Sequence, residues 1–586
     1  MAAKKRRSAK PRPAAPRPRA FPWVWAGAAA AGIVAVFWAY GPALHGSFLF
    51  DDATLPYADP NFNPSLKAWI GGGIRSLLMF SYWLNARIGH DDPYSFHVVG
   101  VLIHAVSSAL VFLVVRKMLE WARCEASSRN LLAGFAAAVF LLHPVQTEAV
   151  AYVAGRSEAL SAMFFFGAFA VFLYRRAPAI GWRETGAVLL LFTAAVLSKE
   201  PPMVLPAVLL LTDYWWNPGF TLSGIRANWR LYASVAVGAP LAAAVILWKV
   251  LASAQTAGFN LKDFTWYQYF FTQCRALFVY IGIFLFPVRL NADWNFPISR
   301  TLLEHGALFG LAALLALAIL AWIYRRRFPL ATYGFFVYLL LMSPTSSILP
   351  IQDAIAERRL YFSMIGLLLI VVDLLARIKV DQRKLAYGCA AVALVAAIGT
   401  HARAAVWSDP IRLWEDITAK SPGKFRARFQ LGYAYYSEQR YDAAVEQFQK
   451  AGALQARTLG ERNNLLADWG LALNGMGRWN DAILKLREAA DTEPTAYIYS
   501  QIGMINAQHS RYDDALAALD RAQKLDAGFA MTYVYRGKIF ELRNDPAGAI
   551  AQFQRALNAD PNNPAGDQIR QELLRLRSIP AATRAQ

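Results

Sequence analysis

Long apolar segments recur through residues 23–403, and no other feature constrains the fold of this chain as strongly. A helix needs about 20 apolar residues to cross a hydrocarbon core of about 30 Å. Of the 586 residues, 56% are hydrophobic and only 17% are charged, as is typical of integral membrane proteins. The sequence therefore predicts an all-α, polytopic membrane bundle of about eleven transmembrane helices. They are expected near 23–44, 96–116, 131–150, 159–174, 184–198, 201–216, 231–252, 302–324, 331–349, 361–376 and 385–402.

The net charge of +20 is distributed as a membrane topology signal. The Pro-rich tail at 1–22 is strongly basic, and further Lys/Arg clusters follow alternate apolar segments, which is the positive-inside pattern. We therefore expect a cytoplasmic tail that contacts membrane lipids and not nucleic acid. The loops 46–95 and 253–301 are expected outside, the second with a re-entrant or interface-lying helix. A bacterial inner membrane is the expected location.

The composition changes after residue 403 to that of a soluble helical domain. A period of about 34 residues, the tetratricopeptide repeat (TPR) length, follows a linker at 404–423. The sequence therefore predicts an extracytoplasmic TPR α-solenoid over 424–575, whose groove is suited to a protein or peptide partner. Dimerisation or scaffold recruitment is the alternative role. Four glycines occupy equivalent first-helix positions: Gly432, Gly470, Gly503 and Gly537.

Ionisable residues gather at the expected outer ends of the apolar segments. Such residues are costly near a bilayer and are therefore functional candidates by default. They occur in five motifs, all on the expected outer side. The candidates are Asp51, Asp52, Arg75, His143, Glu148, Arg156, Glu158, Lys199, Glu200, Glu357, Arg358, Arg359 and Tyr361.

Acids and arginines at the outer edge of a bilayer suit transfer of a sugar from a lipid carrier. Outside the cytoplasm, activated sugars are carried on polyprenyl phosphates, whose anionic head stays at the interface. Arginine binds phosphate in bidentate fashion and stabilises the charge of the leaving group. A carboxylate accepts the proton of the attacking hydroxyl.

The stretch "LLHPVQTEAVAYVAGRSEALSAMFF" closely resembles the signature of the transmembrane and TPR-containing O-mannosyltransferases. The order of features is also similar: an Asp pair after the first helix, "SKE", "ERRLYF" and then outward-facing repeats. That family is similar to membrane glycosyltransferases of the GT-C fold. The resemblance implies a GT-C catalytic domain over 23–403. It also implies inverting transfer of mannose from a polyprenyl-phosphate donor to Ser or Thr hydroxyls of exported proteins.

The resemblance also assigns roles to individual residues. Asp51 would be the base, Asp52 would assist it, and Glu148 would be an acid on the acceptor side. The implied donor-phosphate ligands are Arg156, Arg358 or Arg359, and Lys199. No cofactor is expected besides the lipid-linked donor. A divalent metal is not favoured, because arginines can neutralise the phosphate.

This sequence departs from the family pattern at Gln146, at Ser157-Glu158 and at Ser76. The identities of the sugar and the acceptor therefore stay open. Two other functions also stay open: a GT-C transferase or ligase acting on a lipid or glycan acceptor, and a non-enzymatic membrane scaffold that uses only the repeats.

Overall fold

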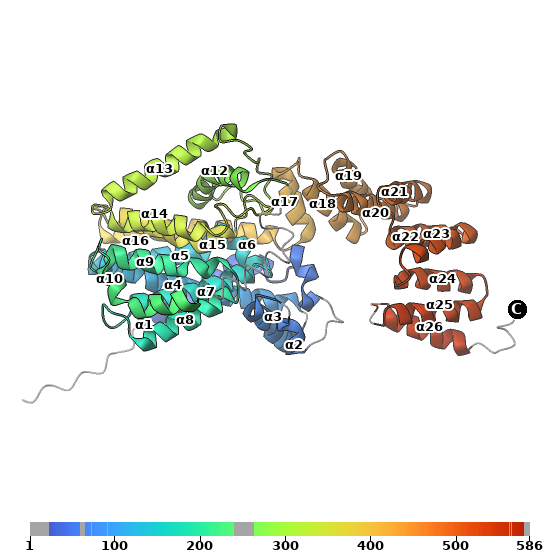
Figure 1. Cartoon of the computed structure of the whole chain (residues 1–586), viewed down its shortest axis with the longest axis horizontal. Coiled ribbons are helices and arrows are strands. Elements are labelled where there is room, and N and C mark those ends of the chain that lie inside the picture. Colours follow the sequence, from blue (N-terminus) through green and yellow to red (C-terminus); the bar gives the residue numbers. More distant parts are fainter. Residues whose placement is uncertain are drawn as a thin grey trace, which may run out of the picture.

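The computed structural model describes residues 23–58, 65–71, 73–90, 92–238, 263–561, 563 and 565–578. Across these ranges the chain folds into helices joined by loops, without β-strands (Figure 1). The all-α prediction is confirmed. The basic tail at 1–22 and most of the apolar segment expected at 231–252 lie outside the described residues.

The membrane domain is a bundle of helices with lengths suited to a bilayer. Among the described residues, five helices are long and apolar enough to cross a membrane. A sixth arises if Ala126–Leu142 and Pro144–Ala151, which meet at a bend of 47°, form one span. The prediction of a polytopic bundle is confirmed, whereas the total of about eleven crossings stays a prediction. The main helices are α1 (Trp23–Tyr40), α4 (Pro93–Trp121), α5 (Ala126–Leu142), α7 (Arg156–Leu173), α8 (Trp182–Val196), α9 (Leu205–Trp216), α13 (Ala307–Tyr324), α14 (Pro329–Met342), α15 (Arg359–Leu375) and α16 (Gln382–Val406).

Burial separates the centre of the bundle from its lipid-facing surface. In the apolar window of α7, 78% of the residues are buried, against 11% for the span that contains α13. Exposed apolar side chains cover the outer helices, among them Ile319 and Ile323. Water would oppose such a surface, but lipid tails solvate it, so the exposed face of α13 is consistent with a membrane.

The closest helix contact in the bundle joins α14 to α15 through two glycines. A Cβ atom on Gly334 would lie 2.5 Å from the carbonyl oxygen of Gly366, and one on Gly366 would lie 2.5 Å from the backbone nitrogen of Tyr338. Membrane helices use small residues in this way, because the backbones can then approach closely. This contact fixes α15, whose first turn carries candidate site residues.

The loop segments contain short helices at the end of the bundle near the repeats. The first loop forms α2 (Leu66–Ile70) and α3 (Ser76–Gly89), and the 143–155 hairpin forms α6 (Thr147–Ala151). The described part of 253–301 contains α12 (Trp266–Leu285), followed by an extended segment. A helix was expected in this loop; its interface-lying placement stays a prediction.

The C-terminal region is a curved stack of helix pairs that extends away from the bundle (Figure 1). At each first-helix glycine a Cβ atom would be too close to the second helix; at Gly432 it would lie 2.6 Å from Phe448. The residues expected to form a linker contain α17 (Pro410–Lys420), which packs on the first repeat, where the Tyr435 hydroxyl donates to Glu415 at 2.6 Å. The repeat helices are α18 (Phe425–Ser437), α19 (Tyr441–Gly452), α20 (Leu459–Gly475), α21 (Trp479–Thr492), α22 (Ala496–Gln508), α23 (Tyr512–Leu525), α24 (Ala530–Leu542), α25 (Pro546–Ala559) and α26 (Gly566–Ser578).

A buried ion cluster joins the first repeat to two loops of the membrane domain. Arg426 donates from Nε to Asp293 at 2.9 Å and from Nη2 to Asp353 at 3.0 Å. Lys424 pairs with Asp293 and donates to the carbonyl of Trp294 at 2.9 Å. Asp293 is only 2% exposed, so removing one of its partners would leave a buried charge uncompensated. The cluster therefore holds the repeats in a defined position.

Candidate active site

The candidate residues come from five separate segments that meet at one end of the bundle. They follow the ends of α1, α5 and α8, and they begin α7 and α15. This end of the bundle is the one that faces the repeats (Figure 1). Antiparallel neighbours place the end of one helix beside the start of the next, so residues far apart in sequence become neighbours here.

The two adjacent aspartates have different surroundings. Asp52 is 1% exposed and accepts hydrogen bonds from the Leu49 N–H at 3.1 Å, the Tyr57 hydroxyl at 3.0 Å and the Ala154 N–H at 2.7 Å. Burial raises the pKa of Asp52 to about 7, although its hydrogen bonds oppose that shift. Asp52 therefore ties the first loop to the 143–155 hairpin.

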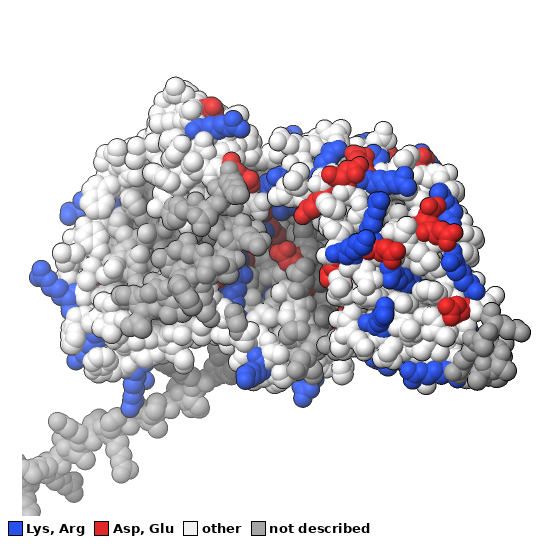
Figure 2. Space-filling view, turned by 45° about the vertical axis from the view of Figure 1, so that its right-hand side comes forward, with Lys and Arg blue, Asp and Glu red and all other residues white. Residues whose placement is uncertain are grey.

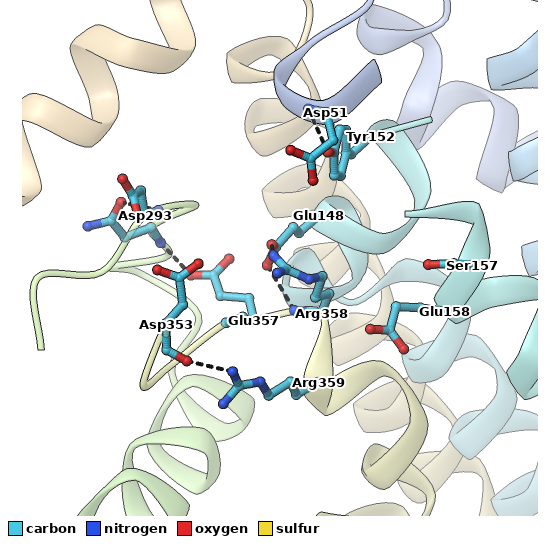
Figure 3. Close-up of polar contacts among 12 residues, drawn as sticks. Asp51, Glu148, Tyr152, Ser157, Glu158, Asp293, Asp353, Glu357, Arg358 and Arg359 are labelled. Carbon is cyan, nitrogen blue, oxygen red and sulfur yellow. Dashed lines mark hydrogen bonds and ion pairs between the residues drawn. The ribbon is translucent and has the colours of Figure 1, made fainter. Parts of the chain in front are cut away.

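Asp51 instead presents an exposed carboxylate. Its backbone N–H donates to the Tyr152 hydroxyl at 3.0 Å, which holds the backbone of the loop at this residue. In Figure 3 this carboxylate lies above Glu148. Next to it, the Phe50 ring packs on Trp414 with centroids 4.7 Å apart, so α17 supports this loop. Of the two aspartates, Asp51 is the one that is exposed.

Glu148 and Arg358 form an ion pair at the centre of the group (Figure 3). Glu148 is 2% exposed and also accepts the Arg358 backbone N–H at 2.8 Å. The Arg358 side chain retains 33% exposure. A guanidinium with one buried partner and an open side is able to take a second anion, such as a phosphate.

Two further ion pairs extend this group of charges. Lys199 pairs with Glu158 and lies 3.3 Å from the Ser157 hydroxyl, to which it donates. Arg75 and Glu200 form a bidentate pair with both N···O distances at 2.9 Å. Lys199 interacts electrostatically with Arg75 and Arg358 as well, so the three ion pairs form one group of interacting charges.

Four of the expected site residues are instead engaged inside the protein. Arg156 is 1% exposed, and its guanidinium lies over the Tyr82 ring, 4.7 Å from the centroid, while donating to Asn85 at 2.7 Å. Arg359 donates to the backbone carbonyls of Asp353 and Ala354. These two arginines brace loops.

His143 and Tyr361 also act within the packing. The His143 ring accepts the Val145 N–H at 3.2 Å, and its Nε2 lies 2.9 Å from the Phe284 carbonyl, which joins α5 to α12. The Tyr361 hydroxyl lies 2.8 Å from Nδ1 of His104 in the core. Both residues connect helices and are separate from the charged group.

Glu357 lies beside the charged group but is 1% exposed. Its carboxylate accepts the Asn291 backbone N–H, and burial raises its pKa to about 8.

Among the described residues, no group of three or more His, Cys, Asp or Glu side chains is arranged to hold a metal ion.

Sequence reasoning missed three residues that shape this site. Tyr152 lies inside the quoted stretch at 141–165, but a tyrosine beside charged residues gave no separate signal. Asp293 and Asp353 belong to loops without helical periodicity, and their common partner, Arg426, lies in the first repeat. Only folding brings Asp293, Asp353 and Arg426 together.

The repeats match the sequence model of the tetratricopeptide repeat family at residues 407–456, 467–528 and 502–564. The TPR prediction is confirmed. The first match begins before α17 and includes it.

Two curated proteins are similar over 89% of the chain. Mouse protein O-mannosyl-transferase TMTC3 is 24% identical over 89% of this chain and 63% of its own length. The human protein of the same name is 23% identical over the same shares. The resemblance to the transmembrane and TPR-containing O-mannosyltransferases is confirmed. Fruit-fly protein O-mannosyl-transferase Tmtc2 is 32% identical over 38% of the chain and 24% of its own length.

The chain spans about 63% of the length of the TMTC3 proteins that it matches. Among solved structures, MamA is 20% identical and covers 26% of this chain and 86% of its own, with a TM-score of 0.23. The Cut9–Hcn1 structure is 15% identical over 90% of this chain and 94% of its own, with a TM-score of 0.25.

Proposed function

We propose that this protein is an inverting glycosyltransferase that moves a sugar, with mannose expected, from a polyprenyl-phosphate donor to Ser or Thr hydroxyls of exported proteins. The observation that carries the proposal is the meeting of Asp51, Glu148 and Arg358 at one end of the bundle (Figure 3), where Lys199 interacts electrostatically with Arg358. The similarity to protein O-mannosyl-transferases over 89% of the chain supports it. The reaction takes place on the outer face of a bacterial inner membrane, with the N-terminus in the cytoplasm.

The donor binds with its phosphate at the partly exposed Arg358 guanidinium and its polyprenyl tail in lipid. Arg358 is the primary phosphate ligand, because its guanidinium is partly exposed and held in place by Glu148. Lys199 adds a second positive charge, which Glu158 orients. Arg156 and Arg359 stabilise the surrounding loops through their buried hydrogen bonds.

In the transfer step, the acceptor hydroxyl oxygen attacks the anomeric carbon and the bond from that carbon to the phosphate oxygen breaks. Asp51 accepts the hydroxyl proton, and polyprenyl phosphate leaves with its negative charge stabilised by Arg358. Attack from the side opposite the leaving group inverts the anomeric configuration. Glu148 orients Arg358 and is therefore a positioning residue in the free protein.

The acceptor polypeptide reaches this centre from the side of the repeats. Tyrosines line the first helices of the repeats, with Tyr433 at 47% and Tyr497 at 39% exposure. Aromatic side chains supply contact area at low entropic cost, so they suit an extended polypeptide.

The test is transfer of radiolabelled mannose from polyprenyl-phosphate mannose to an extract of exported proteins. Wild-type protein should transfer the label, and Asp51→Asn should transfer at least about a thousandfold less, which is roughly 4 kcal/mol of transition-state stabilisation. The Asp51 side chain is exposed, so the variant should keep the wild-type melting temperature. Equal transfer by wild type and Asp51→Asn would remove Asp51 as the base. Absence of transfer from every polyprenyl-phosphate sugar would favour the scaffold alternative.

A further inference from the structure

A cavity of about 270 Å³ lies where the first repeat meets two loops of the membrane domain. Its wall contains residues of the segments 263–264, 294–298, 352–354, 423–426 and 455–461. Figure 2 shows acidic and basic side chains on both sides of the hollow between the bundle and the repeats. Because the ion cluster of Asp293, Asp353, Lys424 and Arg426 joins these parts, the cavity keeps its shape.

The size of the cavity limits its ligand. Clefts for drug-sized molecules measure roughly 300–1,000 Å³, so this one suits a smaller ligand, such as one or two sugar rings. Both domains contribute residues to the cavity wall. A ligand in the cavity would therefore contact the repeats and the membrane domain together.

The wall combines aromatic rings with side-chain amides. The partly buried rings of Trp294 and Phe296 offer apolar faces beside the buried ring of Phe264, and Gln352 and Gln455 offer paired donors and acceptors. The C–H face of a pyranose ring packs on an aromatic face, and its hydroxyls hydrogen-bond to amides. The indole Nε1 of Trp294 is buried and has no hydrogen-bond partner among the described residues. Since buried donors are normally paired, a ligand oxygen would complete this wall.

The charges of the wall are balanced, which excludes a strongly anionic ligand. Three basic residues face three acidic ones, and Arg426 and Lys424 are already paired with Asp293 and Asp353. A phosphate or carboxylate would have to compete with these carboxylates. The wall therefore favours an uncharged ligand that is rich in hydroxyls.

We propose that this cavity binds an uncharged hexopyranose residue carried by a polypeptide that has already been glycosylated. Asp353 of the wall and Arg358 of the candidate centre belong to the same short loop, and Arg359 donates to the Asp353 carbonyl at 2.5 Å. A sugar held here places the neighbouring hydroxyls of its polypeptide near Asp51 and Arg358. This role in acceptor selection rests on the proposed function, whereas binding of the sugar does not.

The experiment measures binding of methyl α-D-mannopyranoside, and of a panel of other neutral methyl hexopyranosides, by saturation-transfer NMR. The protein is held in lipid nanodiscs, because maltoside detergents carry sugar head groups that would compete. Trp294→Ala removes an aromatic face, and Gln352→Ala removes an amide at a partly exposed position that tolerates truncation. Trp266→Ala is the matched control, since Trp266 is 52% exposed and is not part of the wall.

Wild type and Trp266→Ala should bind at least one of these glycosides saturably. Trp294→Ala and Gln352→Ala should raise its Kd at least about tenfold, and Gln352→Ala should do so at an unchanged melting temperature. No saturable binding by wild type, or wild-type affinity in Gln352→Ala, would overturn the inference. The inference would also be overturned if the wild type bound an unglycosylated peptide but no sugar, and if the same variants lost that peptide binding. No donor is present, so failure here is separate from failure of the transfer assay.

Discussion

Two adjacent arginines at the start of α15 have opposite surroundings, although the sequence "ERRLYF" presents them alike. Arg358 is partly exposed beside Glu148, and Arg359 is 8% exposed with its guanidinium bound to loop carbonyls. Successive residues on a helix point about 100° apart, so one turns toward the site while the next turns into the protein. Exposure therefore separates a ligand for substrate from a structural brace.

We predict that Arg358→Gln mainly affects transfer activity and that Arg359→Gln mainly affects stability. Arg358→Gln should lower transfer about 100-fold or more, through loss of charge stabilisation at the leaving group. Arg359→Gln should mainly lower the melting temperature, because several buried acceptors lose their donor. Transfer assays and thermal unfolding of both variants check this. The same loss of transfer in both, at an unchanged melting temperature, would contradict the distinction.

We also predict a pH dependence of stability that Glu357 causes. Its pKa is raised from 4.5 to about 8 in the folded protein, so the folded state holds the proton more tightly than the unfolded state. The stability that this proton contributes is fully present below about pH 4.5 and is lost as the pH rises through about 8. Glu357→Gln should therefore melt progressively higher than wild type as the pH rises through this window. A constant difference in melting temperature across it would exclude Glu357 as the cause.

At the scale of elements, the site depends on the close contact between α14 and α15. Gly334 and Gly366 let the two backbones approach, and this contact sets the position of the α15 first turn that carries Arg358. Helix propensity disfavours glycine, so its presence on both faces reflects packing.

We predict that Gly366→Leu reduces the yield of folded protein and abolishes transfer, because the added side chain meets the Tyr338 backbone. Gly388→Leu on α16 is the matched control, since a Cβ atom there has nothing within 4 Å. Size-exclusion profiles and thermal unfolding of both variants are the measurements. A folded, active Gly366→Leu protein would show that the two helices can separate without cost to the site.

At the scale of the whole molecule, the ion cluster at Asp293 makes the repeats and the membrane domain one unit. Its members come from the 286–301 loop, the 350–358 loop and the start of α18. The repeats therefore do more than extend from the bundle, because they form part of the wall next to the candidate centre.

We predict that Arg426→Ala loosens this junction, because it leaves the buried Asp293 carboxylate with one cation fewer. Amide hydrogen exchange should increase in the 286–301 and 350–358 loops and at α17, and the distal repeats should be unchanged. Lys450→Ala, which removes an exposed ion pair with Glu446, is the control. It should leave amide exchange unchanged in both loops, in α17 and in the distal repeats. Unchanged exchange in Arg426→Ala would show that apolar packing alone holds the junction.

The sequence by itself was sufficient for the class of fold. Apolar segments of membrane length predicted the helix bundle, and a 34-residue period with one glycine per repeat predicted the solenoid, because both patterns are local and repeat along the chain. Alternating basic clusters also predicted that the acids and arginines would share one side, and the structure brings their segments to one end of the bundle.

Only the tertiary structure decided which of these residues face the site. Arg156 was expected at the donor phosphate, yet its guanidinium is buried against the rings of Tyr82 in α3 and Phe96 in α4. The cavity wall joins residues that are more than 150 positions apart. Burial, pairing and cavity shape depend on contacts between distant segments, and a pattern read along one segment carries no information about what packs against it.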